Sequence, residues 1–421
     1  MQQRVVGRLI AAAWLVVVAV LTLTPTSAEP AQREIWCLAC GELGGRDLLL
    51  NVLLFVPFGF ALRLAGMPAR RGLLLVVAVT LVIEVFQMKL IAGRDASLGD
   101  LVANTVGGVA GYVAGARRRL LLLPGAPAAR RLSVAGASLA LGICLTSAWG
   151  VQPSLPRTRY YAQWAAELSN FGHFTGTILG GRAGEEEFPP VGEIAASAAL
   201  RERLLGGRAP LAATVVPDPE QEPRLSPILS IFDEDQREIV LLGQQGSDLV
   251  FRVRTRSTRA RFQHVGVRLE NVFEGPEARA RGRDTTRIAG GLKGAQLWTW
   301  GSRSAAERGA SVTLSPALGW VFLMPAHHEL GRLTLPISAA WIAALFLPAA
   351  YWSGRAARQR GELSRLAPAA VALVVALGVV PSLFGFRPTH WSAWVAGAVA
   401  VVIGTVVGRR AMGGWGIGNR E

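Results

Sequence analysis

The stretch IEVFQMKLIAGRDASLGDLVANTVGG, residues 83–108, decides how this chain folds, because it places polar side chains within and between two strongly apolar runs. Apolar runs of about 20 residues are long enough to cross a bilayer as helices. The polar side chains are Glu84, Gln87, Arg94, Asp100 and Asn104. Polar groups inside a membrane are costly unless they meet a partner or a water-filled cavity. The stretch therefore predicts two membrane helices that hold a polar cluster.

The rest of the chain has the composition of a multi-pass membrane protein. Of its 421 residues, 51% are hydrophobic, and several apolar runs approach the length that a bilayer requires. We predict eight membrane spans, roughly at residues 8–25, 48–66, 72–91, 98–116, 131–149, 336–353, 367–385 and 391–408. A cleaved signal peptide is the alternative for the first span, since a basic start, an apolar core and small residues follow one another there.

The distribution of charge predicts an orientation. Residues 150–330 hold 21 Lys and Arg against 20 Asp and Glu, so the net charge of +15 belongs to the membrane part, which argues against a nucleic-acid partner. With a cytoplasmic N-terminus, every inner segment is rich in arginine, as the positive-inside rule requires. These arginines are Arg4, Arg8, Arg63, Arg70, Arg71, Arg117, Arg118, Arg119, Arg130, Arg131, Arg355, Arg358, Arg360, Arg365, Arg409 and Arg410. Both termini are then cytoplasmic, and residues 150–330 are extracytoplasmic.

This orientation brings the polar side chains to one outward-facing zone. Glu84 and Gln87 lie one helical turn apart, and Asp100 and Asn104 are spaced i and i+4 at the start of the next span. Asn51 opens the second span from the same side, and Arg94 in the short loop is the candidate partner of Glu84. The alternative is that the cluster only holds helices together.

Small residues accompany the cluster. Gly107, Gly111 and Gly115 recur at every fourth position in NTVGGVAGYVAG and form a face that lets another helix approach closely. Pro57 lies about two turns below Asn51 in the second span. We predict that the fourth span is the tightly packed centre of a bundle.

These residues resemble the VanZ-like membrane proteins over about residues 45–116. The resemblance is carried by Asn51, LLFVPFG at 53–59, IEVFQ at 83–87, Arg94, and the ordered Asp100, Asn104 and glycines. It implies a cell-envelope protein, some relatives being associated with low-level teicoplanin resistance. It implies no settled biochemical activity. This chain adds an outer domain and three further spans.

The outer domain is predicted to be β-rich. Short strands with turn residues between them are expected at 227–233, 237–243, 248–255, 262–270, 295–301 and 310–316. In the third of these, apolar residues alternate with Arg252 and Arg254, which predicts one buried and one wet face. The pattern is typical of a sandwich and resembles the concanavalin A-like and laminin-G-like jelly roll, which implies glycan binding.

The predicted fold is thus a polytopic α-helical membrane protein with a jelly-roll sandwich inserted between the fifth and sixth helices. Residues 1–150 are expected to form a five-helix VanZ-like bundle, 151–330 the extracytoplasmic sandwich, and 331–421 a three-helix membrane segment. Membrane lipids and an envelope glycan or lipid-linked precursor are the expected partners, and the oligomeric state stays open.

Acidic residues in DEDQREIV do not predict a glycoside hydrolase. On an extended strand Glu234 and Glu238 would be about 13 Å apart at ~3.3 Å per residue, farther than either hydrolytic geometry allows. Calcium at Asp233, Glu234 and Asp235 is an alternative to a solvated turn. We otherwise expect no cofactor and no metal.

The remaining motifs favour structural interpretations. Cys37 and Cys40 in WCLAC could form a disulfide, stay as free thiols or share a metal, and Cys144 is expected to pack in a span. The motif HHEL at 327–330 lacks the His-Glu-x-x-His spacing of zinc proteases. A set of arginines could meet anionic polymers or line a solvated strand face. The set is Arg252, Arg254, Arg256, Arg259 and Arg261.

Two functions from different classes remain. The first is a module that binds or protects an envelope component, with the polar cluster at the outer leaflet and the sandwich on a glycan. The second is a membrane enzyme in which Glu84 is the general acid or base and Arg94 holds a phosphate or carboxylate. No Walker loop, nucleotide fingerprint or inverted repeat indicates coupled transport.

Overall fold

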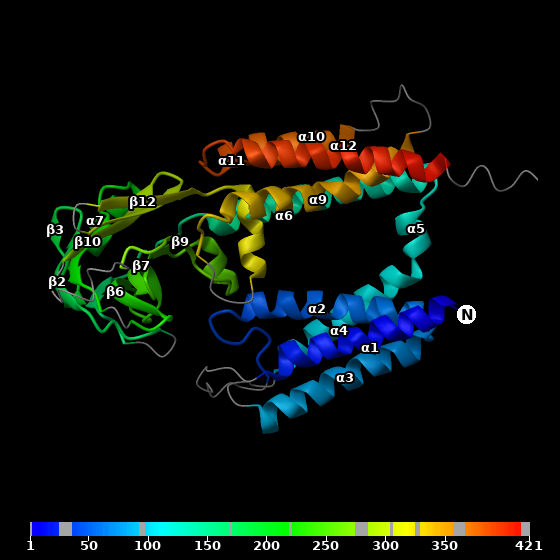
Figure 1. Cartoon of the computed structure of the whole chain (residues 1–421), viewed down its shortest axis with the longest axis horizontal. Helices are drawn as coiled ribbons and strands as arrows, with labels where there is room; N and C mark the ends of the chain where they lie inside the picture. The colour runs from blue at the N-terminus through cyan, green and yellow to red at the C-terminus, as the bar shows by residue number, and fades with distance from the viewer. Residues whose placement is uncertain are drawn as a thin grey trace, which may run out of the picture.

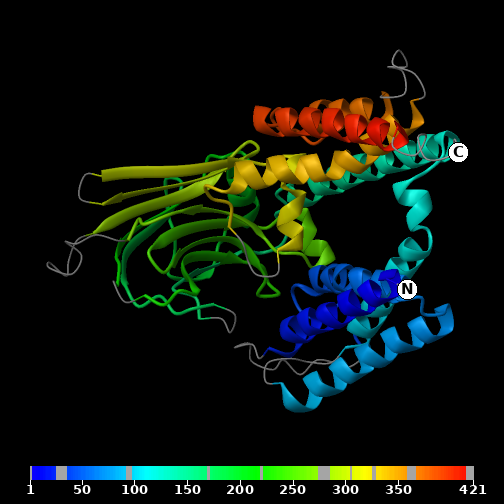
Figure 2. The ribbon, with the colours of Figure 1, turned by 45° about the vertical axis from the view of Figure 1, so that its right-hand side comes forward.

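The structure is a computed structural model, and it describes residues 2–24, 36–91, 97–167, 171–218, 221–273, 285–303, 306–324, 329–357 and 367–413. Two groups of long helices lie side by side, and a β-sandwich is at one end of them (Figures 1 and 2). The chain enters the sandwich from one helix of the second group and returns from the sandwich into another. An inserted β domain in a helical membrane protein is confirmed.

The first helical group consists of four helices packed around a small apolar core. They are α1 (Gln2–Leu23), α2 (Gly44–Leu64), α3 (Ala69–Leu90) and α4 (Leu98–Ala116). Phe55 and Phe58 are fully buried and meet edge to face, with ring centroids 6.2 Å apart. The backbone of α4 lies directly against α2, because Gly107 and Gly111 face the carbonyl oxygens of Val52 and Val56. These contacts agree with the prediction that the fourth span, α4, packs tightly in the bundle.

The second helical group contains the helix before the sandwich and all helices after it. Short α5 (Arg118–Leu122) leads to α6 (Ala126–Val151), which packs with α9 (Thr334–Ala356) and α10 (Ala367–Val374). Helix α12 (Trp391–Gly413) packs on α9 and shares the same apolar core. A π-helical turn (Val375–Val379) and α11 (Val380–Leu383) continue α10. Cys144 is buried in this core, as expected. The predicted fifth span therefore lies with the C-terminal helices rather than with α1–α4.

Six helices of the described residues are long and apolar enough to cross a membrane. They are Gln2–Leu23, Gly44–Leu64, Ala69–Leu90, Ala126–Val151, Thr334–Ala356 and Trp391–Ala411. The other two predicted spans correspond to α4, whose glycines and polar residues lower its hydropathy, and to the shorter apolar helix Pro368–Leu383. The chain is thus a multi-pass membrane protein.

Two six-stranded antiparallel sheets form the sandwich. The first has the order β4-β1-β6-β7-β8-β9, from β1 (Tyr161–Trp164), β4 (Val191–Glu193), β6 (Leu225–Phe232), β7 (Glu238–Gln245), β8 (Asp248–Val253) and β9 (Val265–Leu269). The second has the order β12-β11-β10-β5-β2-β3, from β2 (Thr177–Ala183), β3 (Glu186–Glu187), β5 (Leu211–Val216), β10 (Thr286–Lys293), β11 (Gln296–Arg303) and β12 (Ala306–Thr313). Connecting helices are α7 (Ser197–Leu205), η1 (Arg256–Ala260) and η2 (Pro316–Leu323). Each of the six predicted strands overlaps a strand of these sheets, although the predicted strand 310–316 runs past the end of β12 at Thr313.

The wet face predicted for β8 is wrong, because every residue from Asp248 to Val253 is buried. Phe171 packs against Leu241 and Val250 on the outer side of this sheet, and the Arg252 guanidinium lies 5.6 Å from the Phe171 ring centroid. A segment outside the two sheets, which includes Phe171, thus covers the face of β8 that the alternation of residues predicted to be exposed to water.

The sandwich rests on the ends of both helical groups. On the first group, the Arg46 amide donates to the carbonyl of Arg261 over 3.4 Å, and the Arg261 guanidinium donates to the carbonyl of Ala39. On the second, η2 packs against α6 and α9, where Trp320 Nε1 donates to Ser338 Oγ over 2.9 Å. The domain is therefore fixed to the membrane region by more than its two chain connections.

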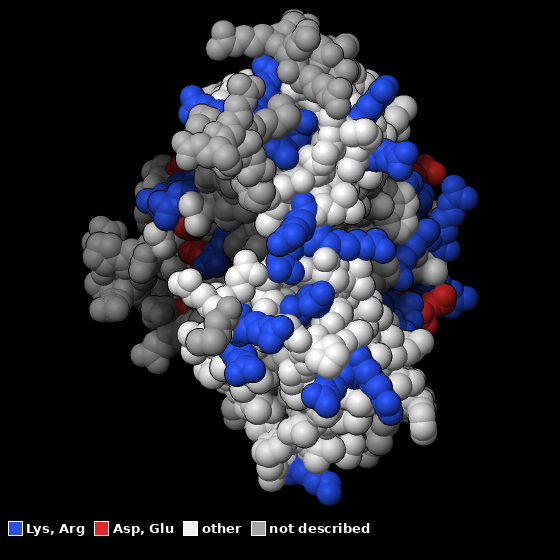
Figure 3. Space-filling model, turned by 90° about the vertical axis from the view of Figure 1, so that its right-hand side faces the viewer, with Lys and Arg blue, Asp and Glu red and all other residues white. Residues whose placement is uncertain are grey.

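The opposite end of the helices is basic. Figure 3 shows that Lys and Arg gather on the face remote from the sandwich, with few acidic residues in view. Helix ends meet at this face: Arg118 at the start of α5 donates to Gln3 Oε1, and Arg355 of α9 donates to the carbonyl of Pro124 over 3.2 Å. The arginine-rich inner segments of the sequence meet at one end of the molecule.

Candidate functional site

A hydrogen-bonded polar cluster lies at the sandwich-facing end of the first helical group. Ser97 connects its two carboxylates: the Ser97 amide donates to Glu84 Oε2 over 3.0 Å, and the Ser97 hydroxyl donates to Asp100 Oδ2 over 2.8 Å. Asn51 Nδ2 donates to the other oxygen, Asp100 Oδ1. Three helices, α2, α3 and α4, therefore contribute to one site.

Local sequence positions this cluster through the start of α4. Ser97 is the N-cap of the helix, and its Oγ accepts from the Asp100 amide over 3.0 Å. Serine at the N-cap with an acidic residue three positions later is a capping arrangement, which satisfies amides that the first helical turn leaves free. Asp100 also lies in the first turn, where the helix dipole favours a negative charge. The cap thus holds the Asp100 carboxylate toward α2 and α3.

Glu84 is the most unusual group of the site. Its side chain is 7% exposed, and Oε1 has no hydrogen-bond partner among the described residues. A buried carboxylate oxygen without a hydrogen-bond partner costs free energy. A second carboxylate, that of Asp100, bonds to the same serine, Ser97. The arrangement suits a ligand that brings a donor or a positive charge, or a group that exchanges a proton with Glu84.

The other predicted members of the cluster have different surroundings. Gln87 is buried and donates from Nε2 to the carbonyl of Thr22 in α1 over 2.9 Å, so it ties α3 to α1. Asn104 is 2% exposed, and its Oδ1 has no partner in the described chain. Pro57 lies inside α2. Arg94, predicted to pair with Glu84, lies outside the described residues.

Ser97 and Thr22 are site residues that sequence reasoning missed. The spacing of Ser97 and Asp100 was a usable signal, because Ser-x-x-acid before an apolar run marks a helix start. Thr22 contributes only its backbone carbonyl, since its hydroxyl donates to the Val18 carbonyl over 2.8 Å. A backbone contact between distant helices leaves no mark in the sequence.

The acidic turn of the sandwich is held together by hydrogen bonds and an ion pair within the chain. Asp233 Oδ1 accepts from the amides of Asp235 and Arg237 over 3.1 and 2.9 Å, and Oδ2 accepts from Arg254 over 2.7 Å. No group of three or more metal-binding side chains occurs within the described ranges. Glu238 pairs with Arg252 and is unavailable as the partner of Glu234 in hydrolysis.

Two other motifs can be followed only in part. Cys37 and Cys40 are both half-buried, and a disulfide between them stays a prediction. Both histidines of HHEL fall outside the described residues, whereas Glu329 and Leu330 are buried. Of the predicted arginine set, Arg252 and Arg254 form ion pairs with Glu238 and Asp233. Those two guanidinium groups therefore do not form a free anionic-polymer site.

A half-buried histidine, His264, lies beside the ion pair of Arg252 and Glu238. His264 contacts the Glu238 carbonyl oxygen through Nε2 over 3.3 Å. Burial is the main cause that lowers the pKa of His264 below its ordinary value of 6.5, and Arg252 and Arg254 act in the same direction while Glu238 opposes them. The folded sandwich therefore disfavours the charged form of this imidazole.

The pH dependence of stability follows from this shift. Between the lowered pKa and 6.5 the unfolded chain binds a proton that the folded chain does not, so stability should fall as the pH drops below 6.5, by up to about 1.4 kcal/mol per pH unit. His264→Gln should reduce that fall. Melting of the purified full chain in detergent, followed by tryptophan fluorescence from pH 7.5 to 5, measures it. Equal pH slopes for wild type and variant would contradict a lowered pKa at His264.

Comparison with known proteins bears on the helical part of the chain. Residues 10–119 match the family model described as VanZ/LLP1. None of the curated proteins or solved structures matches the chain. The matched region runs from α1 to the end of α4 and contains the whole polar cluster. The chain is therefore a multi-pass membrane protein whose N-terminal helical region, residues 10–119, matches the VanZ/LLP1 family model.

Proposed function

We propose that this protein binds a lipid-linked or glycan component of the cell envelope at the outer face of the membrane and protects it. The observation that carries the proposal is the buried, unpartnered Glu84 Oε1 in a cluster that faces the sandwich. A buried carboxylate oxygen without a partner in a membrane helix indicates a ligand-binding or proton-transfer site, because burying it unpaired is energetically costly. Protection against teicoplanin-type glycopeptides is the cellular effect proposed.

The proposed orientation follows from charge. The basic end that Figure 3 shows would be cytoplasmic under the positive-inside rule, with both termini on that side. The polar cluster and residues 150–330 would then lie at the outer face. The polar cluster and the sandwich would thus both face the outer side of the membrane, where the same envelope component could contact them.

The sandwich offers an aromatic surface for a glycan. Trp298 and Trp300 alternate along β11 with the buried Leu297 and Thr299, so both indoles lie on the outer face of their sheet, half-buried. Trp298 pairs in register with Gly291 of β10, and its ring lies over that glycine, since a Cβ placed there would be 3.2 Å from Trp298 Cζ2. Tryptophan combines a large apolar face with a polar N–H, a combination suited to a sugar ring. We propose this face as the glycan-contacting surface.

A membrane enzyme is the second candidate, because the same unpartnered Glu84 oxygen could take or give a proton. Its neighbour Asp100 is fully engaged with Ser97 and Asn51, so Glu84 is the better-placed acid or base. In this interpretation the ligand would be cleaved or transferred rather than only held.

Susceptibility of a bacterial host tests the proposal. Expression of wild type should reduce susceptibility to teicoplanin, and Glu84→Gln should abolish the reduction at equal membrane level. Asp47→Asn is the matched control, because it removes another carboxylate at the same end of the helices, on a side chain that is 44% exposed. Trp298→Ala with Trp300→Ala should weaken protection if the sandwich binds glycan.

Glu84→Asp separates the two candidates. The shorter side chain keeps the charge and should preserve most of a binding contact, whereas it moves a catalytic oxygen by about an ångström, which costs roughly 100-fold in rate. Strong protection by Glu84→Asp supports binding, and its loss at equal expression supports the enzyme. Wild type that gives no protection, or Glu84→Gln that protects as well as wild type, would contradict the proposal.

A further inference from the structure

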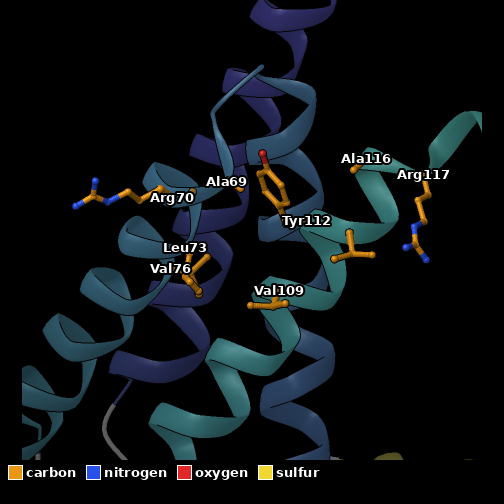
Figure 4. Close-up of a pocket in the computed structure, with 11 residues that line it drawn as sticks. Ala69, Arg70, Leu73, Val76, Val109, Tyr112, Ala116 and Arg117 are labelled. Carbon is orange, nitrogen blue, oxygen red and sulfur yellow. The ribbon is translucent and has the colours of Figure 1, made fainter.

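The arginines at the basic end of the helices differ in how far they are buried (Figure 3). Arg70 and Arg117 flank an apolar groove between α3 and α4, but their side chains point to opposite sides and away from it (Figure 4). Both are exposed. Arg355, in the last turn of α9, is only 9% exposed. A buried guanidinium group needs acceptors and an opposite charge, because burying a charge without them is costly.

The position of Arg355 is fixed by contacts between the end of α9 and the connection from α5 to α6. Trp352 Nε1 donates to the carbonyl of Leu121, near the end of α5, over 2.7 Å. Arg355 Nη2 donates to the carbonyl of Pro124 over 3.2 Å. Pro124 directly precedes Gly125, which is the N-cap of α6. The Arg355 guanidinium group is therefore held at the N-terminus of α6.

Most of the hydrogen-bonding capacity of Arg355 is unused. Its Nε and Nη1 are buried and have no hydrogen-bond partner, and no ion pair joins it to an acidic side chain in the part of the chain that the structure describes. Arg409 of α12 also has two buried nitrogens without partners. Helix α12 lies against α9 here, since a Cβ on Gly408 would be 3.1 Å from the Arg355 amide nitrogen. Buried positive charge thus lacks compensation at this end of the second helical group.

The start of α6 favours an anion at the same place. Gly125 provides no side-chain cap and the first turn holds no acidic residue, so the free amides and the positive end of the helix dipole are uncompensated as well. The N-cap is open, because Gly125 is exposed and a Cβ there would meet nothing within 4 Å. Helix N-termini and arginine side chains are both established phosphate-binding groups in proteins.

We infer that Arg355 and the N-terminus of α6 together bind a phosphate group. Phosphate carries several acceptor oxygens on one centre, so it can accept from the guanidinium group and from the helix amides at once, and its negative charge compensates the buried cation. Both soluble phosphate esters and phospholipid headgroups carry this group. Arg355 lies at the end of the membrane-crossing helix Thr334–Ala356, where both can reach it. The site is at the end opposite the polar cluster and does not depend on the proposed function.

Melting of the purified full chain in detergent tests the inference, because a ligand that binds the folded state raises the melting temperature. Inorganic phosphate is compared with chloride at equal ionic strength. Palmitoyl-oleoyl phosphatidic acid is compared with palmitoyl-oleoyl glycerol, which lacks only the phosphate. Stabilisation of wild type by inorganic phosphate supports a soluble phosphate as the ligand, and stabilisation by phosphatidic acid alone supports a phospholipid headgroup.

Arg355→Gln should lower the affinity for the stabilising probe by about 10-fold or more, since it removes charged hydrogen bonds to the phosphate. Its amide can still donate to the Pro124 carbonyl. Arg410→Gln is the matched control, because Arg410 is exposed near the end of α12. It should respond to the probe as wild type does. Stabilisation of wild type by neither probe, or an equal response of Arg355→Gln and wild type, would overturn the inference.

Gly125→Asp tests the site with the arginine in place. The backbone of Gly125 is extended, with φ −66° and ψ 161°, so aspartate fits there as an N-cap. Its carboxylate would occupy the helix N-terminus that the phosphate needs, and the response to the probe should be lost. Gly125→Asn is the uncharged control of equal size and should keep the response. A Gly125→Asp protein that responds as strongly as Gly125→Asn would overturn the placement of the phosphate at α6.

Discussion

Gly111→Ala is expected to prevent the first helical group from packing correctly. A Cβ on Gly111 would overlap the carbonyl oxygen of Val56 and lie 2.9 Å from the backbone nitrogen of Phe60. These neighbours are backbone atoms, so they cannot move aside as a flexible side chain can. The helices α2 and α4 would have to separate, and their contact is the most extensive within the VanZ/LLP1 region. We expect a loss of at least about 3 kcal/mol of stability.

Gly142→Ala is the matched control for this prediction. Gly142 is also inside a membrane helix, α6, but a Cβ there would meet nothing within 4 Å. Alanine is about 1 kcal/mol more favourable than glycine in a helix, so this variant should be neutral or stabilised. Folded yield and melting temperature in detergent compare the two. A Gly111→Ala protein that melts with wild type would show that α2 and α4 are not held backbone to backbone.

The same glycine illustrates what the sequence could predict about this protein. Small residues at every fourth position have one physical use in a membrane helix, close approach, and Gly107 and Gly111 are found in that contact. The polar cluster was predictable for a related reason, since few arrangements of membrane helices accommodate Glu84 and Asp100 except side by side. Alternation and turn residues likewise predicted six of the twelve strands of the sandwich.

Features that depend on distant segments were not predictable. The placement of α6 in the same group as α9 and α12 depends on which apolar faces fit together. The hydropathy of these helices is similar, so it does not predict which of them pack together. The engagement of Gln87 with the Thr22 carbonyl leaves no pattern, because the acceptor is backbone. The groove between α3 and α4 is lined by valine and leucine, which would look the same on a closed helix pair.

Strand β8 shows how a local rule can fail for a physical reason. Alternation placed Arg252 in water, yet its side chain is 5% exposed and forms two hydrogen bonds with Glu238, over 3.2 and 2.7 Å. A charge can be buried when an opposite charge accepts its hydrogen bonds. Glu238 begins the neighbouring strand β7, so the pairing depends on strand register rather than on adjacency in sequence.

Arg252→Met should therefore be strongly destabilising, although methionine is apolar and of similar length. The substitution leaves the Glu238 carboxylate, itself 5% exposed, without its guanidinium partner, and removing one member of a buried ion pair costs about 3–5 kcal/mol. Arg332→Met is the matched control: Arg332 pairs with Glu270 on the surface and is 84% exposed, and such pairs contribute about 0–1 kcal/mol.

A double substitution distinguishes the loss of the Arg252–Glu238 ion pair from the cost of leaving the Glu238 carboxylate buried without a partner. Arg252→Met with Glu238→Leu removes both charges, and well-packed apolar replacements of buried ion pairs are often neutral. The double variant should therefore melt above Arg252→Met alone in the full chain, as followed by the tryptophan fluorescence of the sandwich. If it melts at or below the single variant, the stranded Glu238 charge is not the cause of the destabilisation, and the arginine acts through its packing on Phe171 instead.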